Sequence, residues 1–274
     1  NISYQVPLSK IPIVDWIQLN ARYGFDYTWQ AAPSVIDSST FTLVPNPILQ
    51  NTIQNSNTKQ LNGTLTFTQL YNKLPFFKRL LAPTPATPAS KTVKPPKADA
   101  PKSPADTAKT KKPKVPGTIN PFVKFVGKLI LSVKSAGLNY SETNGTALPG
   151  YKPKTQFFGQ DYNYETVSGS TTTAPGFGFT VGSQKDLRVK AAKNNWLTTD
   201  TLFNSQYSQS YNQSISGRGT VEPFDGMRIE LTATKNYSKA HTENYRINAN
   251  TGEYNSYNAL DNGNFSISTI AWGT

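Results

Sequence analysis

Residues 17–30, IQLNARYGFDYTWQ, alternate apolar and polar side chains without a break. Successive side chains of a β-strand point to opposite sides of the sheet, so this pattern separates the residues into two faces. The apolar face would carry Ile17, Leu19, Ala21, Tyr23, Phe25, Tyr27 and Trp29. The polar face would carry Gln18, Asn20, Arg22, Gly24, Asp26, Thr28 and Gln30. The sequence therefore predicts one long strand with two chemically opposite faces.

The length of this strand favours a membrane setting. A strand in a soluble sandwich is usually about 5 to 6 residues long, and a strand that crosses a bilayer needs about 9 to 11. The aromatic residues gather between Tyr23 and Trp29, as is typical where a lipid-facing strand reaches the headgroup layer. We interpret residues 17–30 as a transmembrane β-barrel strand. On that interpretation the seven apolar residues face lipid, and Gln18, Asn20, Arg22 and Asp26 face the lumen.

Other stretches share the period of two and predict further strands. They are Ile2 to Leu8, Leu61 to Phe67, Leu131 to Tyr140, a sparser run from Tyr207 to Val221, Met227 to Tyr237, and a last strand beginning with Phe265 and Ile267. The apolar face of residues 131–140 changes parity near Ala136, which suggests a β-bulge. In the strand from Met227, Ile229 and Leu231 are predicted to face lipid, and Arg228 and Glu230 the lumen. Strand follows strand without a βαβ rhythm, so the fold class is all-β.

The composition agrees with a barrel wall. The hydrophobic fraction is 36%, while Tyr and Phe each occur fourteen times, and a wall needs apolar residues at only alternate positions. No run of 18 apolar residues is present, so a transmembrane helix is excluded. The absence of cysteine excludes disulfides, thiolate metal sites and Cys nucleophiles. The chain opens with an alternating pattern and without Met or an apolar leader, so we expect it to be a piece of a longer protein.

An insert at residues 83–119 carries half of the net charge of +12. It holds eight of the 28 basic residues against Asp99 and Asp106, and it is built mainly from Pro, Ala, Lys, Thr and Ser. With scarcely an aliphatic side chain to bury, we predict that it is disordered or extended. A solvated linker is the favoured interpretation, and nucleic acid, anionic lipid or an acidic periplasmic partner are the alternatives. Because the excess charge is concentrated in one tail-like insert, no nucleic-acid partner is expected.

Two short helices are predicted to flank this insert. Pro75 would open one that runs through Phe76, Phe77, Leu80 and Leu81. Asn120 and Pro121 form an N-cap and N1 pair, and apolar residues from Phe122 to Val133 follow at helical spacing. The chain is thus organised as 1–82 (barrel strands, a first long loop and a short helix), 83–119 (the insert) and 120–274 (an amphipathic helix, further strands and long loops).

The connections between the predicted strands differ in length. Those at 9–15 and 223–226 are short, and those at 31–57, 142–205 and 250–263 are long. Outer-membrane barrels have short periplasmic turns and longer extracellular loops. The helices and the insert are therefore expected on the periplasmic side. Counted from the first hairpin, the connections alternate consistently between the two sides as far as Trp272.

The chemistry-bearing residues do not form a convincing catalytic set, and we expect neither an enzyme nor a cofactor or metal. His241 is the only histidine, so a catalytic triad has one possible base, and a polar strand residue facing water is the favoured interpretation. Glu222 and Asp225 flank a predicted turn at Asp-Gly, which explains them without acid–base chemistry. The glycines of PGFGFTVG lack the Lys-Ser/Thr of a phosphate loop, so close backbone packing is favoured.

Several blocks of sequence together resemble the SprA (Sov) family. They are QVPLSKIPIVDWI, NTIQNSNTKQLNGTLTF followed by LYNKLPFFK, NYSETNGTALPGY, APGFGFTVG with NNWLT shortly after, VEPFDGMRIELTATKNYS and GNFSIST. The resemblance runs from Asn1 to about Thr274 and is interrupted mainly by the lysine-rich insert. That family forms the outer-membrane translocon of the type IX secretion system, which exports proteins and in many members supports gliding motility.

The resemblance implies a fold, a location and partners. The fold would be a single-chain barrel of very many antiparallel strands in the Gram-negative outer membrane, with surface-exposed loops. Seven or eight strands cannot close such a barrel, so the chain would form one arc of its wall. Its partners would be outer-membrane lipid, secreted cargo proteins, a small PorV-type barrel at a lateral opening and a periplasmic plug protein. The resemblance assigns no residue of this chain to the PorV-type or plug contact.

Two hypotheses therefore remain open. In the first, the chain is part of the wall of a protein-conducting channel, and mixed charges on its lumen face wet the cargo without holding it. In the second, it is a soluble or surface-anchored β-sandwich from an adhesin, with Tyr and Asn displayed for glycan contact. The two differ in what covers the apolar face of residues 17–29, which is lipid in the first case and a second sheet in the other.

Overall fold

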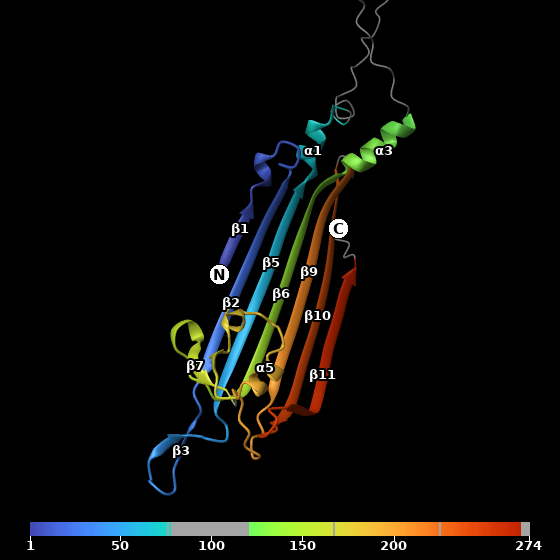
Figure 1. The fold of residues 1–274 in the computed structure, drawn as a ribbon. Helices are drawn as coiled ribbons and strands as arrows, with labels where there is room; N and C mark the ends of the chain where they lie inside the picture. Colours follow the sequence, from blue (N-terminus) through green and yellow to red (C-terminus); the bar gives the residue numbers. More distant parts are fainter. Residues whose placement is uncertain (76, 78–120, 167, 225, 270–274) are drawn as a thin grey trace, which may run out of the picture.

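The computed structural model describes residues 1–75, 77, 121–166, 168–224 and 226–269. Its main feature is a seven-stranded sheet in the order β1-β2-β5-β6-β9-β10-β11, in which every neighbouring pair is antiparallel. The strands are β1 (Ile2–Val6), β2 (Ile17–Gln30), β5 (Asn51–Thr66), β6 (Val133–Tyr151), β9 (Tyr207–Phe224), β10 (Met227–Ile247) and β11 (Tyr254–Thr269). Figure 1 shows these long strands running side by side along the length of the molecule.

The two ends of the sheet differ (Figure 1). At one end, the turn end, lie the 3-10 helix η1 (Leu8–Lys10), helices α1 (Phe67–Lys73) and α3 (Pro121–Leu131), and the turn between β9 and β10. At the other end, the loop end, lie a small hairpin of β3 (Ser34–Ile36) and β4 (Leu43–Pro45) and the segment 152–206. That segment contains η2 (Phe157–Gly159), β7 (Asp161–Glu165), β8 (Thr171–Ala174), α4 (Phe177–Thr180) and α5 (Arg188–Lys193). None of the described helices is both long and apolar enough to cross a membrane.

The strand predicted from residues 17–30 is confirmed as β2 with the same bounds. The bulge predicted near Ala136 is also present, as a register shift between Val133 and Ser135 where β6 meets β9. The connection predicted at 223–226 is short, since β9 ends at Phe224 and β10 begins at Met227, and the connection after β1 is short as well. The described residues are thus mostly β, with a few short helices.

Several strands are longer than predicted, so the loops between them were predicted to be longer than they are. β5 begins at Asn51 rather than Leu61 and ends at Thr66, so Phe67 opens α1 instead of closing a strand. β6 extends to Tyr151, and β11 begins at Tyr254, well before Phe265. The long connections are therefore 31–50 and 152–206, and the third is only the short turn at 248–253. Asn, Ser, Thr and Gln occupy both faces of the missed parts, so no alternation of polarity marks them.

The amphipathic helix predicted after Asn120 is confirmed as α3. α1 is a helix that the sequence analysis did not anticipate. The helix predicted from Pro75 falls mostly outside the described residues, as do the insert 83–119, Asn120, Asp225 and Trp272. β5 pairs with β6 over their length, so residues on either side of the insert belong to one sheet.

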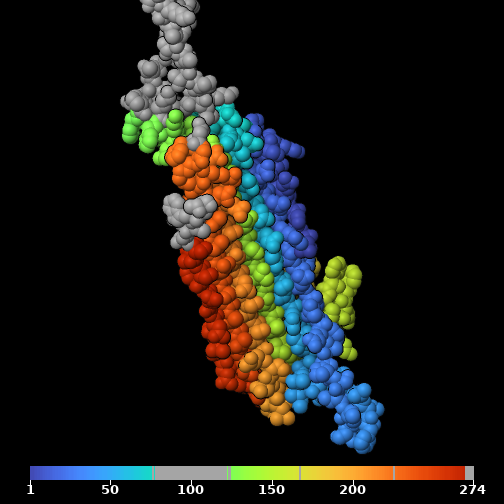
Figure 2. Space-filling view, turned by 180° about the vertical axis from the view of Figure 1, so that it is seen from behind, coloured from blue at the N-terminus to red at the C-terminus, as the bar shows by residue number. Residues whose placement is uncertain are grey.

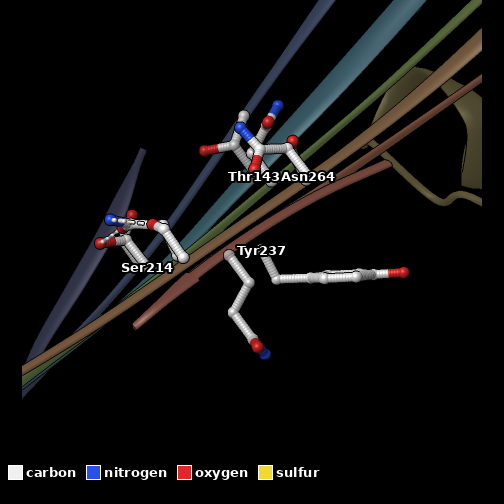
Figure 3. Close-up of a pocket in the computed structure, with 10 residues that line it drawn as sticks. Thr143, Ser214, Tyr237 and Asn264 are labelled. Carbon is white, nitrogen blue, oxygen red and sulfur yellow. Dashed lines mark hydrogen bonds between the residues drawn. The ribbon is translucent and has the colours of Figure 1, made fainter. Parts of the chain in front are cut away.

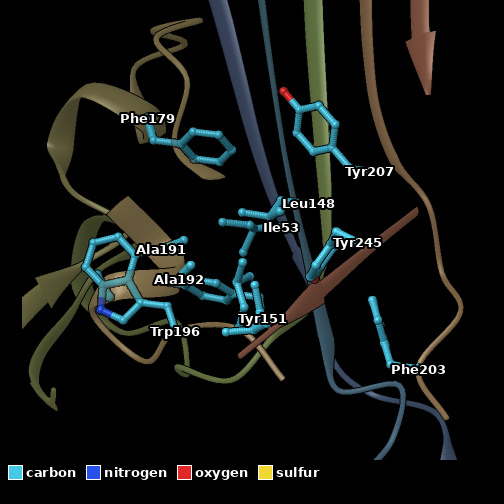
Figure 4. Close-up of a cluster of buried hydrophobic side chains, with 13 residues drawn as sticks. Ile53, Leu148, Tyr151, Phe179, Ala191, Ala192, Trp196, Phe203, Tyr207 and Tyr245 are labelled. Atoms are coloured by element: carbon cyan, nitrogen blue, oxygen red, sulfur yellow. The ribbon is translucent and has the colours of Figure 1, made fainter. Parts of the chain in front are cut away.

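The main buried core lies at the loop end and not along the sheet. Segment 152–206 packs against the ends of the strands, and the side chains between them form one cluster (Figure 4). Its fully buried members include Ile53, Leu148, Tyr151, Trp196, Phe203 and Tyr245. A second, smaller cluster around Tyr71 and Leu131 lies at the turn end.

Candidate functional site

The register of the strands places the apolar residues of one face in a continuous band near the turn end. Directly opposed residues of an antiparallel pair lie on the same face. One such row runs from Leu19 through Gly63, Leu138 and Gly217 to Ala233, across five neighbouring strands. We call this surface the apolar band.

The apolar band extends several rows to either side of Leu138. Its members are Ile17, Leu19 and Ala21 of β2; Leu61, Gly63 and Leu65 of β5; Val133, Ala136, Leu138 and Tyr140 of β6; Ile215, Gly217, Gly219 and Val221 of β9; and Ile229, Leu231 and Ala233 of β10. A groove over the band is lined almost wholly by apolar atoms, and Leu138 is 50% exposed beside it. No described segment covers this groove, so its apolar surface is open to the surroundings.

The opposite face of the sheet is polar from edge to edge. Its rows consist largely of Asn, Gln, Ser and Thr, and cross-strand hydrogen bonds join them. Ser214 Oγ donates to Asn236 Oδ1 at 2.8 Å, and the hydroxyls of Thr234 and Ser268 lie 2.6 Å apart. Figure 2 views the sheet from this side, and the strands show without a covering segment. Figure 3 shows Thr143 and Asn264 on this polar face and Tyr237 on the other.

The residues predicted to face the lumen lie on this polar face. Gln18, Asn20, Arg22 and Asp26 are exposed on one side of β2. Glu230 lies opposite Thr220, and Thr220 lies opposite Ser135, so these three residues share the polar face. Arg228 is exposed and forms an ion pair with Glu230 at 2.9 Å. The structure therefore brings the six residues together on one face, and whether this face lines a lumen stays a prediction.

A row of aromatic, charged and amide side chains closes the apolar band on the side of the loop end. It runs across the sheet through Tyr23, Lys59, Glu142, Gln213 and Tyr237. Lys59 Nζ lies 2.8 Å from Glu142 Oε1. We call this row the boundary row, because the face is apolar on one side of it and covered by protein on the other.

Segment 152–206 is docked on the same face as the apolar band, beyond the boundary row. The Tyr23 hydroxyl donates to the Val181 carbonyl at 2.9 Å. Asn55 Nδ2 donates to the carbonyls of Phe179 and Ser183, each at 2.9 Å. Asn57 Nδ2 donates to the Gly182 carbonyl at 2.5 Å. Two buried asparagines of β5 thus hold the backbone of this docked segment against the sheet.

The docked segment corrects part of the predicted lipid-facing set. Tyr27 packs edge-on against Phe179 with ring centroids 6.2 Å apart, and Trp29 Nε1 donates to the Pro153 carbonyl at 3.3 Å. Phe25 lies beneath Gly182. These three residues are therefore partly buried beneath the chain itself and are not the open, wholly lipid-facing side chains that were predicted. Ile17, Leu19, Ala21, Ile229 and Leu231 lie in the open band, and Tyr23 lies at its boundary.

The glycine of PGFGFTVG closest to the sheet has no room for a side chain. Gly182 has a φ of +86°, and a Cβ there would lie 2.9 Å from the Cβ atoms of Phe25 and Asn57. The same holds at Gly159, where a Cβ would lie 2.7 Å from the Tyr27 ring. The expectation of close backbone packing at this motif is confirmed for Gly182.

Arg188 of α5 ties the docked segment to β10. Its Nη1 donates to Glu243 Oε1 at 2.5 Å, and its Nη2 to Asp186 Oδ2 at 2.8 Å. The Glu243 side chain is only 3% exposed and also accepts a hydrogen bond from the Tyr254 hydroxyl at 2.6 Å. Hydrogen bonding from the Arg188 guanidinium holds the pKa of Asp186 below its usual range. The guanidinium also stacks 4.8 Å from the centre of the Tyr207 ring.

His241 is more enclosed than the expected water-facing strand residue, because its side chain is 21% exposed. Nδ1 lies 3.1 Å from Asp261 Oδ1, and Nε2 lies 3.3 Å from Glu243 Oε2. Both ring nitrogens are therefore engaged by carboxylates rather than directed at a serine. Within the described ranges, no three His, Cys, Asp or Glu residues are placed to hold a metal ion.

The docked segment, Asn55 and Asn57 were not identified from sequence as functional. The signal in the sequence was that asparagines stand at two positions of β5 where the alternation would place apolar residues.

No protein-family model matches the chain, and no curated protein matches it either.

Proposed function

We propose that the chain is part of the wall of a protein-conducting channel in the outer membrane. The observation that carries this proposal is the pairing of an open apolar band with an uninterrupted polar face on the two sides of one sheet. A sheet in water buries its apolar face, whereas the outer wall of a transmembrane barrel presents it to lipid. The polar face would then line an aqueous lumen.

The height of the apolar band supports a membrane. On β6 it runs from Val133 to Tyr140, which at about 3.3 Å per residue is about 23 Å. The lipid-facing band of an outer-membrane barrel is about 25 Å tall and is flanked by aromatic residues. The boundary row supplies Tyr23 and Tyr237 at one limit of the band.

The sandwich alternative is not favoured by the described residues. The other two sheets have two short strands each, β3 with β4 and β7 with β8, and both belong to the connections at the loop end. Neither covers the apolar band. A sandwich would need a second sheet over that band to bury it.

The sheet is an arc in this proposal, because β1 and β11 form its two edges and do not pair with each other. The resemblance to the SprA family gives the channel its proposed role in type IX secretion and gliding motility. Secreted proteins would be its cargo, and a PorV-type barrel and a periplasmic plug its partners. The turn end would face the periplasm and the loop end the outside.

A blocking experiment tests the conduit. This chain has no cysteine of its own. In the full-length protein with any cysteine outside this chain replaced, Gln54→Cys places a single biotin–maleimide site on the polar face near the loop end, and Lys185→Cys places one on the docked segment at the same end. Streptavidin bound at Gln54→Cys of the full-length protein should reduce export, because it would stand in the path of the cargo. Streptavidin bound at Lys185→Cys should leave export unchanged. Equal export from both labelled variants would argue against a lumen on the polar face.

A further inference from the structure

α3 exposes the side of the helix that a water-soluble protein would bury. Its apolar residues follow at i, i+3, i+4, i+7 and i+8, so they form one stripe along the helix. The exposed fractions along this stripe are 71% at Phe122, 67% at Phe125, 36% at Val126, 57% at Leu129 and 46% at Ile130. The side of the helix that packs on the rest of the chain carries the buried Gly127 and Leu131.

The helix is anchored at its C-terminal end. The Tyr71 hydroxyl of α1 donates to the Ile130 carbonyl at 2.7 Å, and Leu131 packs in the small cluster with Tyr71. Glu222 N donates to the Ser132 carbonyl at 2.6 Å, which ties the same point to β9. From this anchor α3 projects obliquely beyond the ends of the strands (Figure 1). Its orientation is therefore fixed, while no described segment covers Phe125, Leu129 and Ile130 of its stripe.

The stripe lies next to the apolar band. After α3 ends at Leu131, β6 starts at Val133, whose partner Val221 belongs to the band. The helix has 11 residues, so it is about 16 Å long at about 1.5 Å per residue and cannot cross a hydrocarbon core of about 30 Å. A helix of this kind lies in the plane of the membrane interface.

The charge of this region is complementary to an anionic surface. α3 carries Lys124 and Lys128 and no Asp or Glu, and Lys128 is exposed, whereas Lys134 beyond the helix forms an ion pair with Glu222 at 3.8 Å. Lysines near the polar side of an interfacial helix are attracted to anionic lipid headgroups. A lipid surface therefore matches both the apolar stripe and the charge.

We propose that α3 is a membrane-surface anchor at the turn end of the wall. Its apolar stripe rests on acyl chains of the inner leaflet, and Lys128 lies among anionic phospholipid headgroups. This inference rests on the proposed function, because it needs the apolar band to be in the same membrane. It adds a second lipid contact, made by a helix instead of a strand.

Site-specific quenching in the full-length protein tests the anchor. Leu129→Cys and its neighbour Lys128→Cys are each labelled with an environment-sensitive fluorophore in nanodiscs containing phosphatidylglycerol. The Leu129→Cys label should be quenched by nitroxide carried on lipid acyl chains, and the Lys128→Cys label by iodide in water. Replacing phosphatidylglycerol with phosphatidylcholine should weaken the lipid quenching at Leu129→Cys.

Two results would overturn the anchor. Quenching of the Leu129→Cys label by iodide would place the stripe in water, and protection from both quenchers would mean that protein covers it. A third label at Leu138→Cys separates this inference from the proposed function. If lipid quenches the label at Leu138→Cys but not at Leu129→Cys, the anchor is rejected and the wall is retained. If lipid quenches the label at neither position, the anchor and the wall are both rejected.

Discussion

Arginine in place of Leu138 is expected to block assembly of the protein into the outer membrane. Leu138 is half exposed in the middle of the apolar band, between Gly63 and Gly217 of the neighbouring strands. An arginine on the lipid face near the bilayer midplane costs about 2 to 4 kcal/mol. The neighbouring glycines offer no polar partner, so the guanidinium would stay in hydrocarbon.

Asn139→Arg is the matched control for this substitution. Asn139 is exposed on the same strand, one residue further along and on the polar face, where Ser216 is its hydrogen-bond partner at 3.4 Å. An arginine there would meet water, so assembly should be unchanged. The measurement is the amount of full-length folded protein in purified outer membranes. Equal amounts for the two variants would mean that the faces do not differ, which contradicts the proposed wall.

Removal of the Arg188 side chain is expected to release the docked segment from the sheet. Arg188→Ala would leave Glu243 as a buried carboxylate, with its side chain only 3% exposed. Removing one partner of a buried ion pair costs about 3 to 5 kcal/mol. Because the Arg188 side chain is itself 23% exposed, we expect an effect of about 3 kcal/mol, at the lower end of that range.

Limited proteolysis of the full-length protein measures this release. Arg188→Ala should make segment 152–206 sensitive to protease under conditions in which the wild-type protein is cut slowly. Lys185→Ala changes an exposed lysine of the same segment and should have no effect. Adding Glu243→Gln to Arg188→Ala should restore part of the protection, because the buried group is then neutral. If the double variant is cut as fast as the single one, the charge on Glu243 is not what holds the segment.

The strands were predictable where their two faces differ in polarity. Residues 17–30 alternate throughout, and β2 has those bounds. Residues 51–60 do not alternate, because Asn55 and Asn57 face the docked segment and Gln54 faces the other side. A period of two in hydrophobicity exists only when one face is polar and the other apolar. Residues 51–60 therefore form a strand through their pairing with β2 and β6, although their sequence lacks the alternation that predicts one.

The environment of the aromatic residues could not be predicted from their positions alone. Tyr27 and Trp29 have the same alternation whether lipid or protein covers them. The structure shows protein, since Phe179 and the Pro153 carbonyl contact them. This contact depends on residues more than a hundred positions apart in the chain, and local pattern analysis carries no information about such pairs.

The face on which each residue of β2 lies was predictable, in contrast to what covers that face. Leu19 and Asn20 lie on opposite faces, as their order in the sequence requires. The boundary between the open band and the covered part of the same face is set by Asn57 and Gly182. Gly182 fits there because it lacks a side chain, and the sequence showed only that a glycine was present.

A cryo-electron microscopy map of the full-length protein in a lipid nanodisc would show whether lipid covers the apolar band. We expect bilayer density against the Leu138 side of β2, β5, β6, β9 and β10. That density should end at the boundary row near Tyr23 and Tyr237, with water on the Asn139 side. A layer of protein packed over Leu138, or an apolar band lying outside the bilayer, would mean that the sheet is not a membrane wall.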